Sequence, residues 1–396
     1  MTSPYEGANS LGGARARSYS VTATAALGLR LTRDTELYYN PEMAMGIPFS
    51  GLLGLGGFPN GELAKTSGPH PVFYTARLFL RHTWGFGGGT EQLDSDANQL
   101  AGIVDKRRLV VTAGRLSLLD IFDSNSYAHD PRTQFMNWAF MTHAAYDYAA
   151  DARGYTDGIS VEWIDDGYSL RYGRYAQPRE PNGLKLDQDL WHHFGDQVEL
   201  GKDYELGGQK GTWRLLAFRN RSVMASYADA LAIADASVPA AVPTLDSART
   251  GVKTKWGLGV AVEHQLLPDL GVFARAMRAD GRTETYAFTD VDRSASFGAV
   301  LQGERWGRPK DAAGLALAIN GLSSAQRQFL AQGGMTFFLG DGQLRYGQER
   351  ILEAFYSYAV NDKLAVSLDV QHVQNPGYNR DRGPANFFGI RVHAEF

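Results

Sequence analysis

The side chains best suited to chemistry gather in one stretch, from Asp120 to Trp138. In fewer than twenty residues it holds carboxylates, an arginine, side-chain amides and aromatic rings. Carboxylates and amides hydrogen-bond pairs of hydroxyl groups, and aromatic faces stack on the apolar faces of sugar rings. The stretch therefore indicates recognition of a polyhydroxylated ligand. The candidate contacts are Asp120, Asp123, Asn125, Asp130, Arg132, Gln134, Asn137 and Trp138.

Two other interpretations of this stretch remain open. It fits a structural loop whose charges pair with the surrounding wall. Asp120, Asp123 and Asn125 also suit a calcium ion, although their spacing is not that of a known calcium loop. Apart from that calcium alternative, we expect no cofactor and no metal. The pair His192-His193 falls in a loop and is expected to be solvated.

Signatures of catalysis are missing from the sequence. It contains no H-E-x-x-H, no G-x-S-x-G and no phosphate-binding loop. The net charge is only -4, so no basic field favours nucleic acid. There are no cysteines, as is common in proteins that cross an oxidising periplasm. These observations predict a protein that is neither an enzyme nor a nucleic-acid binder.

The elements that must position the stretch are strands with one apolar and one polar face. In residues 385–396, Phe388, Ile390 and Val392 alternate with Arg391 and His393. A soluble β-sandwich strand shows the same alternation. No apolar run reaches the roughly 18 residues of a membrane helix. The chain is therefore either a soluble β protein or a membrane β-barrel.

Alternating connections favour the barrel. Fifteen strands can be identified, from residues 18–32 to residues 385–396, and short turns alternate with long loops. Outer-membrane barrels have short periplasmic turns and long extracellular loops. The longest departure from strand pattern is 116–154. Residues 85–106 are long in a short-turn position and suggest a periplasmic excursion, while helical turns are expected within 222–251 and 325–331.

The alternation also predicts which side chains face lipid and which face the lumen. Charges facing hydrocarbon are costly, so the apolar set must point outward. The outward set includes Tyr19, Leu27, Trp256, Val260, Phe297, Leu368 and Val392. The lumen wall is expected to carry Glu263 together with Glu42, Arg77, Arg81, Arg171, Arg275, Glu349, Glu353, Asp369 and Arg391.

Counting back from the last strand places the start of residues 18–32 on the extracellular side. Barrels of this class normally begin in the periplasm with an even strand count. We therefore expect that an upward strand and a signal peptide are missing before residue 18, through truncation or a misplaced start. The alternative is an unrecognised strand within residues 116–154 or 335–348.

Several motifs together resemble the carbohydrate-selective outer-membrane porin family, OprB type. They are Asp120-Ile121-Phe122-Asp123, Tyr127-Ala128-His129-Asp130-Pro131-Arg132, Phe135-Met136-Asn137-Trp138, Asp147-Tyr148-Ala149-Ala150-Asp151, Gly347-Gln348-Glu349-Arg350-Ile351-Leu352-Glu353 and Asn375-Pro376-Gly377-Tyr378-Asn379-Arg380-Asp381-Arg382-Gly383-Pro384. The similarity spans nearly the whole chain.

The resemblance implies a single barrel over residues 1–396. It would be an all-β, antiparallel transmembrane barrel of about sixteen strands in the outer membrane of a Gram-negative bacterium. Small sugars would cross by facilitated diffusion, past residues 116–154 folded into the lumen as a constriction. The other partners implied are outer-membrane lipid and the barrel-assembly machinery, through the C-terminal Phe396. The alternative is a general or weakly ion-selective porin without a sugar site.

Overall fold

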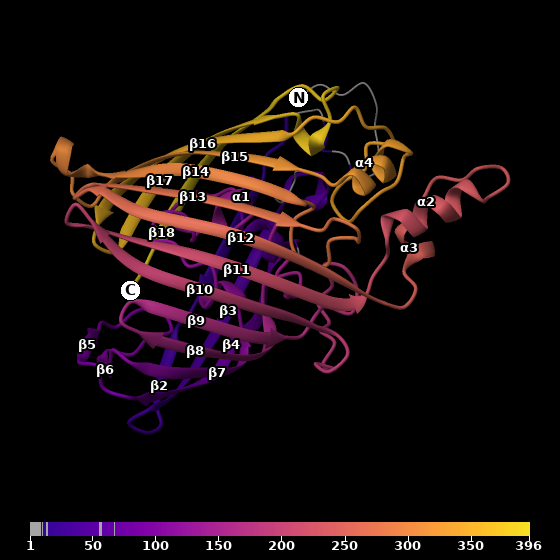
Figure 1. Cartoon of the computed structure of the whole chain (residues 1–396). Helices are drawn as coiled ribbons and strands as arrows, with labels where there is room; N and C mark the ends of the chain where they lie inside the picture. The colour runs from indigo at the N-terminus through magenta and orange to yellow at the C-terminus, as the bar shows by residue number, and fades with distance from the viewer. Residues whose placement is uncertain (1–8, 10, 13–14, 55–57, 67) are drawn as a thin grey trace.

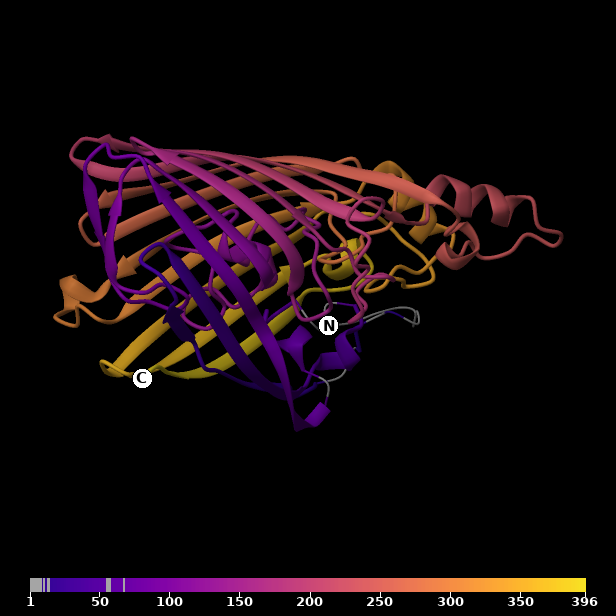
Figure 2. The same cartoon turned by 90° about the horizontal axis from the view of Figure 1, so that it is seen from below.

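One antiparallel sheet of sixteen strands dominates the structure, a computed structural model that describes residues 9, 11–12, 15–54, 58–66 and 68–396. The sheet curls into a barrel (Figures 1 and 2). In the described part of the chain, no helix is long and apolar enough to cross a membrane. The strands of the sheet are β1 (Tyr19–Thr24), β2 (Leu27–Arg30), β3 (Thr35–Ile47), β4 (Gly68–Gly85), β7 (Arg108–Leu116), β8 (Thr156–Asp165), β9 (Tyr168–Tyr175), β10 (Phe194–Leu206), β11 (Gln209–Val223), β12 (Val252–Leu267), β13 (Leu270–Ala279), β14 (Arg293–Gln302), β15 (Ala312–Gly321), β16 (Glu349–Asn361), β17 (Leu364–Gln374) and β18 (Ala385–Ala394).

Strands that are neighbours along the chain pair from β7 to β18, and β7 joins the sheet through β4. Among the described residues, no strand pairing joins β1 to β18. The all-β, antiparallel barrel fold predicted from the sequence is confirmed. This fold places the connections at the two ends of the barrel. Long loops lie at one end, and the short turns lie at the other together with residues 85–106.

The two faces of the sheet differ as the alternation predicted. On the outside, Trp256 is 55% exposed and Phe388 is 80% exposed, while Glu353 on the inside is fully buried. Tyr19, Leu27, Val260, Phe297, Leu368 and Val392 are likewise exposed, and Glu263, Asp369 and Arg275 are buried. An apolar outer wall and a polar inner wall are what a membrane barrel requires.

The first strand is broken, which corrects the prediction of an unbroken strand over residues 18–32. β1 and β2 pair with β3 in one continuous register, but the ladder stops between them. The Ala25 N–H donates to the Pro41 carbonyl (3.1 Å), but proline has no N–H to return the bond. The Asn40 side-chain amide donates to the Ala25 carbonyl instead (3.2 Å). Taken as one strand, β1 and β2 leave fifteen crossings, the number expected.

Long connections lie at one end of the barrel and short turns at the other (Figure 1). The long-loop end carries η1 (Phe49–Leu52), η2 (Leu63–Lys65), α2 (Tyr227–Asp235), α3 (Leu245–Ala248), α4 (Ser324–Ala331) and η5 (Pro376–Tyr378). The helical turns expected in 222–251 and 325–331 are therefore confirmed. The short-turn end carries η4 (Gly303–Trp306).

The connection of residues 85–106 holds a hairpin that the sequence did not reveal. Its strands are β5 (Thr90–Leu93) and β6 (Gly102–Asp105), which form a separate two-stranded sheet at the short-turn end (Figure 1). The Asn98 carbonyl accepts from Arg81 on β4 (2.8 Å), and the Leu100 N–H donates to the Tyr38 hydroxyl (3.1 Å). The excursion is thus fastened to the barrel wall.

Residues 116–154, here called the inner segment, lie within the barrel (Figures 1 and 2). The segment holds η3 (Leu118–Asp120) and α1 (Trp138–Met141). Its Phe135 ring packs on Phe273 of β13 (5.8 Å between ring centroids) and on Phe355 of β16 (4.9 Å). The core of this barrel therefore lies between the inner segment and the wall.

Candidate functional site

Polar side chains of the inner segment first shape the segment itself. The Asn125 carbonyl oxygen Oδ1 accepts from the N–H groups of Tyr127 (2.9 Å) and Ala128 (3.0 Å). Gln134 Oε1 accepts from two backbone N–H groups (2.7 and 3.1 Å), and Asn137 caps α1 by accepting from Ala139 (3.0 Å). Such side-chain acceptors satisfy backbone groups that a loop leaves unpaired. Asn125, Gln134 and Asn137 therefore stabilise the conformation of the segment, besides making it polar.

A buried ion pair ties the inner segment to β13. Asp123 and Arg275 are 1% and 3% exposed, and the closest approach of Arg275 Nε to the carboxylate is 3.0 Å. Thr142 Oγ1 (2.6 Å) and the His143 N–H (3.1 Å) donate to the same carboxylate. Burial alone would raise the pKa of Asp123, but Arg275 and these donors hold it below its usual range. Burial lowers the pKa of His143 to about 4, so this imidazole is neutral at pH 7.

A second set of ion pairs ties the segment to β3 and β4. Arg77 of β4 forms a two-bond pair with Asp120 (2.7 and 2.6 Å). Arg132 lies between Glu42 of β3 and Glu62, 2.9 Å from each carboxylate. Two-bond arginine pairs fix direction as well as distance. The segment is therefore held in one orientation against this wall.

Carboxylates on β10 and β12 accept backbone N–H groups of the inner segment. Glu199 Oε2 accepts from Asp123 (2.7 Å), and its other oxygen pairs with Arg171 (2.6 Å). Glu263 Oε2 accepts from Ser126 (2.6 Å). These bonds satisfy backbone N–H groups of the segment that would otherwise need a water molecule as their hydrogen-bond partner.

Strands β16 to β18 hold the segment from a further side. Glu353 accepts from the Met136 and Asn137 N–H groups (2.5 and 3.1 Å). Asn137 Nδ2 donates to Gln371 on β17 (2.9 Å), and Arg391 of β18 donates to the Pro131 and Gln134 carbonyls (2.8 and 2.7 Å). Gln371 also donates to Asp369 (2.9 Å). The inner segment thus bridges strands from widely separated parts of the wall.

Most of the predicted lumen-wall residues take part in these contacts, and two do not. Glu42, Arg77, Arg275, Glu353 and Arg391 contact the segment directly, and Arg171 and Asp369 act one bond further out. Arg81 instead donates to the Asn98 carbonyl in the connection of residues 85–106. Glu349 accepts from the Gly377 N–H (2.9 Å) near the long-loop end.

Burial divides the predicted ligand contacts into two groups. Asp123, Asn137 and Trp138 are 1%, 1% and 6% exposed, and Trp138 packs on Phe58 (5.5 Å between centroids). Asn125 is also buried. The Asp120 side chain is 22% exposed, and Asp130, Arg132 and Gln134 are partly exposed. Only this second group presents polar atoms to the lumen.

The three residues of the calcium alternative each contact a different partner. Asp120, Asp123 and Asn125 point at separate partners, namely Arg77, Arg275 and backbone N–H groups. In the described ranges, no group of three or more metal-ligating side chains comes together. His192 and His193 lie in a loop, each beside its own aspartate.

Several residues that bond the inner segment, or pair with its partners, were not predicted from the sequence. Glu199 lies on the polar face of a predicted strand, so the alternation contained the signal for it. Glu62 and Lys65 come from a glycine-rich loop with no periodic pattern, and Lys65 pairs with both Glu62 (3.1 Å) and Glu42 (3.4 Å). Only the folded chain shows that this loop reaches the inner segment.

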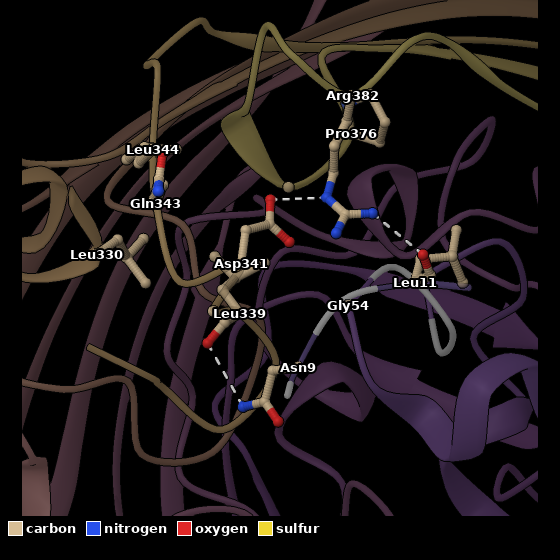
Figure 3. Close-up of a pocket in the computed structure, with 12 residues that line it drawn as sticks. Asn9, Leu11, Gly54, Leu330, Leu339, Asp341, Gln343, Leu344, Pro376 and Arg382 are labelled. Carbon is tan, nitrogen blue, oxygen red and sulfur yellow. Dashed lines mark hydrogen bonds and ion pairs between the residues drawn. The ribbon is translucent and has the colours of Figure 1, made fainter. Parts of the chain in front are cut away.

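Loops at the long-loop end contact one another. Asn9 donates to the Leu339 carbonyl (3.4 Å), and Arg382 bonds both Asp341 (2.7 Å) and the Leu11 carbonyl (3.1 Å), as Figure 3 shows. The pocket between them has a volume of about 20 Å³, room for about one water molecule. It is therefore a packing feature and not a sugar site.

Comparison with solved structures supports the barrel fold. The high-pH structure of Pseudomonas putida OprB superposes with a TM-score of 0.73 at 16% identity, covering 99% of this chain and 91% of that one. The low-pH structure of the same protein gives 0.52 at 14% identity, covering 96% and 86%. None of the curated protein sequences compared with the chain matches it.

The family assignment comes from the sequence match. The family model described as carbohydrate-selective porin, OprB family, matches residues 13–396. Porins are outer-membrane channels and not enzymes, and the match does not favour a general porin without sugar preference. The chain belongs to the OprB family of carbohydrate-selective porins and is an outer-membrane channel for carbohydrates.

Proposed function

We propose that the inner segment is the constriction of this channel and that sugars cross the membrane along its exposed edge. The observation that carries the proposal is the ring of contacts from β3, β4, β10, β12, β13 and β16 to β18. A segment held from so many sides cannot swing out of the lumen without breaking several buried bonds. A sugar must then pass through the space that the segment leaves.

The exposed group supplies the sugar contacts in this proposal. Asp120, Asp130, Arg132 and Gln134 present carboxylate, guanidinium and amide atoms that bond hydroxyl pairs. Their own protein bonds keep them in place, which limits the ordering cost of binding. Transport requires weak binding at several points, because the ligand must leave again. Partly exposed charged groups suit this better than an enclosed pocket.

The buried group has a positioning role. Asp123 holds the segment to Arg275, Asn137 caps α1 and binds Gln371, and Trp138 fills the core beside Phe58. Asn125 shapes the turn that precedes Ala128. We propose no cofactor for transport, since facilitated diffusion needs only the polar path.

Assembly is proposed to depend on the C-terminal strand. Phe396 is fully exposed, and Phe388, Ile390 and Val392 form an apolar outer face on β18. An apolar strand face ending in an aromatic residue is available to the barrel-assembly machinery. Removing Phe396 should reduce the amount of folded protein in the outer membrane, measured on membrane fractions, without altering the single-channel conductance of the molecules that do insert.

The proposal is tested by sugar block of ion current in planar bilayers. In the variant Asp120→Asn/Asp130→Asn, the concentration of sugar for half block should rise about threefold to tenfold, because charged acceptors become neutral. The matched control is Asp246→Asn, since Asp246 lies in α3 and its side chain is 88% exposed. Block that is unchanged in the double variant would contradict the contact set.

A further inference from the structure

A hollow lies on the short-turn side of the inner segment. Its volume is about 730 Å³, within the range of small-molecule sites. It is bounded by the turn between β8 and β9, by the adjoining ends of β10, β11 and β12, and by Ser126 and Tyr127 of the inner segment. Its polar lining includes Asp203, Lys210, Thr212, Glu263 and Gln265. None of these was among the predicted sugar contacts.

The ring of Tyr127 is seated against the wall at this hollow. A Cβ atom on Gly271 of β13 would lie 1.9 Å from Tyr127 Cε1 and 2.1 Å from Cζ, so any side chain at that position would displace the ring. The backbone around the ring is fixed as well. Ser126 donates to Glu263 (2.6 Å), and Tyr127 donates to Asn125 (2.9 Å). Wall and segment together therefore determine where the ring lies.

Tyr127 differs from Trp138 in what it offers a ligand. Trp138 is 6% exposed, and its ring packs against other side chains of the core. Tyr127 is partly exposed at the hollow. Burial and the nearby Glu263 carboxylate raise the pKa of the Tyr127 phenol, so its hydroxyl stays protonated and able to donate. The inner segment thus has one aromatic face in reach of a sugar entering this hollow.

The polar lining has bonding capacity left for a ligand. Asp203 Oδ1 accepts from Thr212 (2.8 Å), which leaves its second carboxylate oxygen. Gln265 donates to the Pro268 carbonyl (3.0 Å), which leaves its own carbonyl oxygen. Lys210 forms no ion pair with any described residue. Acceptors and a cation beside an aromatic face match the hydroxyl edge and apolar face of a pyranose.

We infer that this hollow is a second sugar subsite, on the periplasmic side of the constriction, in which a pyranose ring stacks on Tyr127. Its hydroxyls bond Asp203, Lys210 and Gln265. The inference rests on the proposed function, because it places the subsite next along the path past the inner segment. A sugar leaving the constriction would be transferred to this subsite before it is released into the periplasm. Stepwise transfer between weak sites is how selective pores combine binding with flow.

The test is maltose block of single-channel current through the full chain, with maltose added on the short-turn side. Tyr127→Ala should raise the half-blocking concentration about fivefold, the effect of losing one aromatic stacking contact. Tyr127→Phe keeps the ring and should stay within about twofold of the original protein. Lys210→Gln changes an exposed side chain and should raise the value about threefold.

A second variant moves the ring without changing it. Gly271→Ala should weaken block as Tyr127→Ala does, because the new methyl group occupies the seat of the ring. Gly389→Ala is the matched control on β18, since its Cβ would meet neighbours only at 3.4 Å or more. Heat-modifiable electrophoretic mobility verifies folding, and Lys210→Gln decides the matter if the Tyr127 variants do not fold.

The outcomes separate the two proposals. Block in the original protein that all three variants, Tyr127→Ala, Gly271→Ala and Lys210→Gln, leave unchanged would overturn the subsite, and the constriction would stand. Absence of block in the original protein would overturn the proposed function itself. Weaker block in these variants together with normal block in Gly389→Ala would establish the subsite.

Discussion

The ion pair between Asp123 and Arg275 provides the sharpest test of how the inner segment is held. Asp123→Ala leaves the guanidinium of Arg275 buried, with two backbone acceptors, the carbonyls of Phe140 (3.0 Å) and of residue 123 itself (3.4 Å). It also removes the acceptor of Thr142 and of the His143 N–H. Breaking a buried pair on one side costs about 3–5 kcal/mol, and each orphaned donor adds roughly 1 kcal/mol or more. We expect a loss of about 5 kcal/mol in the free energy of unfolding.

The double variant Asp123→Ala/Arg275→Met separates the charge effect from general damage. It removes both charges and keeps an apolar side chain in the volume of Arg275. The double variant leaves no buried charge without a partner. We therefore expect its loss in the free energy of unfolding to be at least about 2 kcal/mol smaller than the summed losses of Asp123→Ala and Arg275→Met. The assay is denaturant unfolding in detergent, with single-channel current noise as a report on loop mobility. Strictly additive losses, or a single-variant loss below about 1 kcal/mol, would refute the anchoring role.

The remaining predictions concern the lipid face and one buried carboxyl. Val260→Arg places a charge on the outer wall and should lower the free energy of unfolding by about 2–4 kcal/mol. Thr254→Arg, on the same strand and face but near the rim, should lower it by only about 0–1 kcal/mol. Equal losses would contradict the position of Val260 nearer the middle of the membrane. Burial raises the pKa of Asp290, in the loop before β14, to about 6. The folded state therefore binds the proton more tightly than the unfolded state, so stability should fall as pH rises from about 4 to about 6 and level off above that. Thermal unfolding across this range should show that slope in the original protein, and Asp290→Asn should lose it.

Much of the fold could be predicted because strand alternation is local. Each predicted strand has a counterpart, and the outward side of Trp256 and Phe297 follows from period two alone. The break between β1 and β2 could not be predicted, because it depends on Pro41 standing opposite Ala25 across the sheet. Pairing across strands is not visible in the pattern of a single strand.

The site was less predictable than the fold. The types of Asp123, Asn137 and Trp138 indicated ligand contact, but enclosure by the wall buries them. Burial of a loop residue is decided by what packs on it from elsewhere in the chain, and no periodicity records that. The contact of Tyr127 with Gly271 joins two segments far apart in sequence, so it too emerges only on folding.

The most direct measurement for the constriction is a sugar titration of single-channel current through the unaltered protein. We expect stable ohmic channels whose current falls with added maltose along a saturating curve, as binding within the lumen requires. We also expect Asp120→Asn/Asp130→Asn to shift this curve to higher sugar concentration. A current that falls only in proportion to solution viscosity, with no saturation, would contradict the claim that the inner segment forms a sugar-binding constriction.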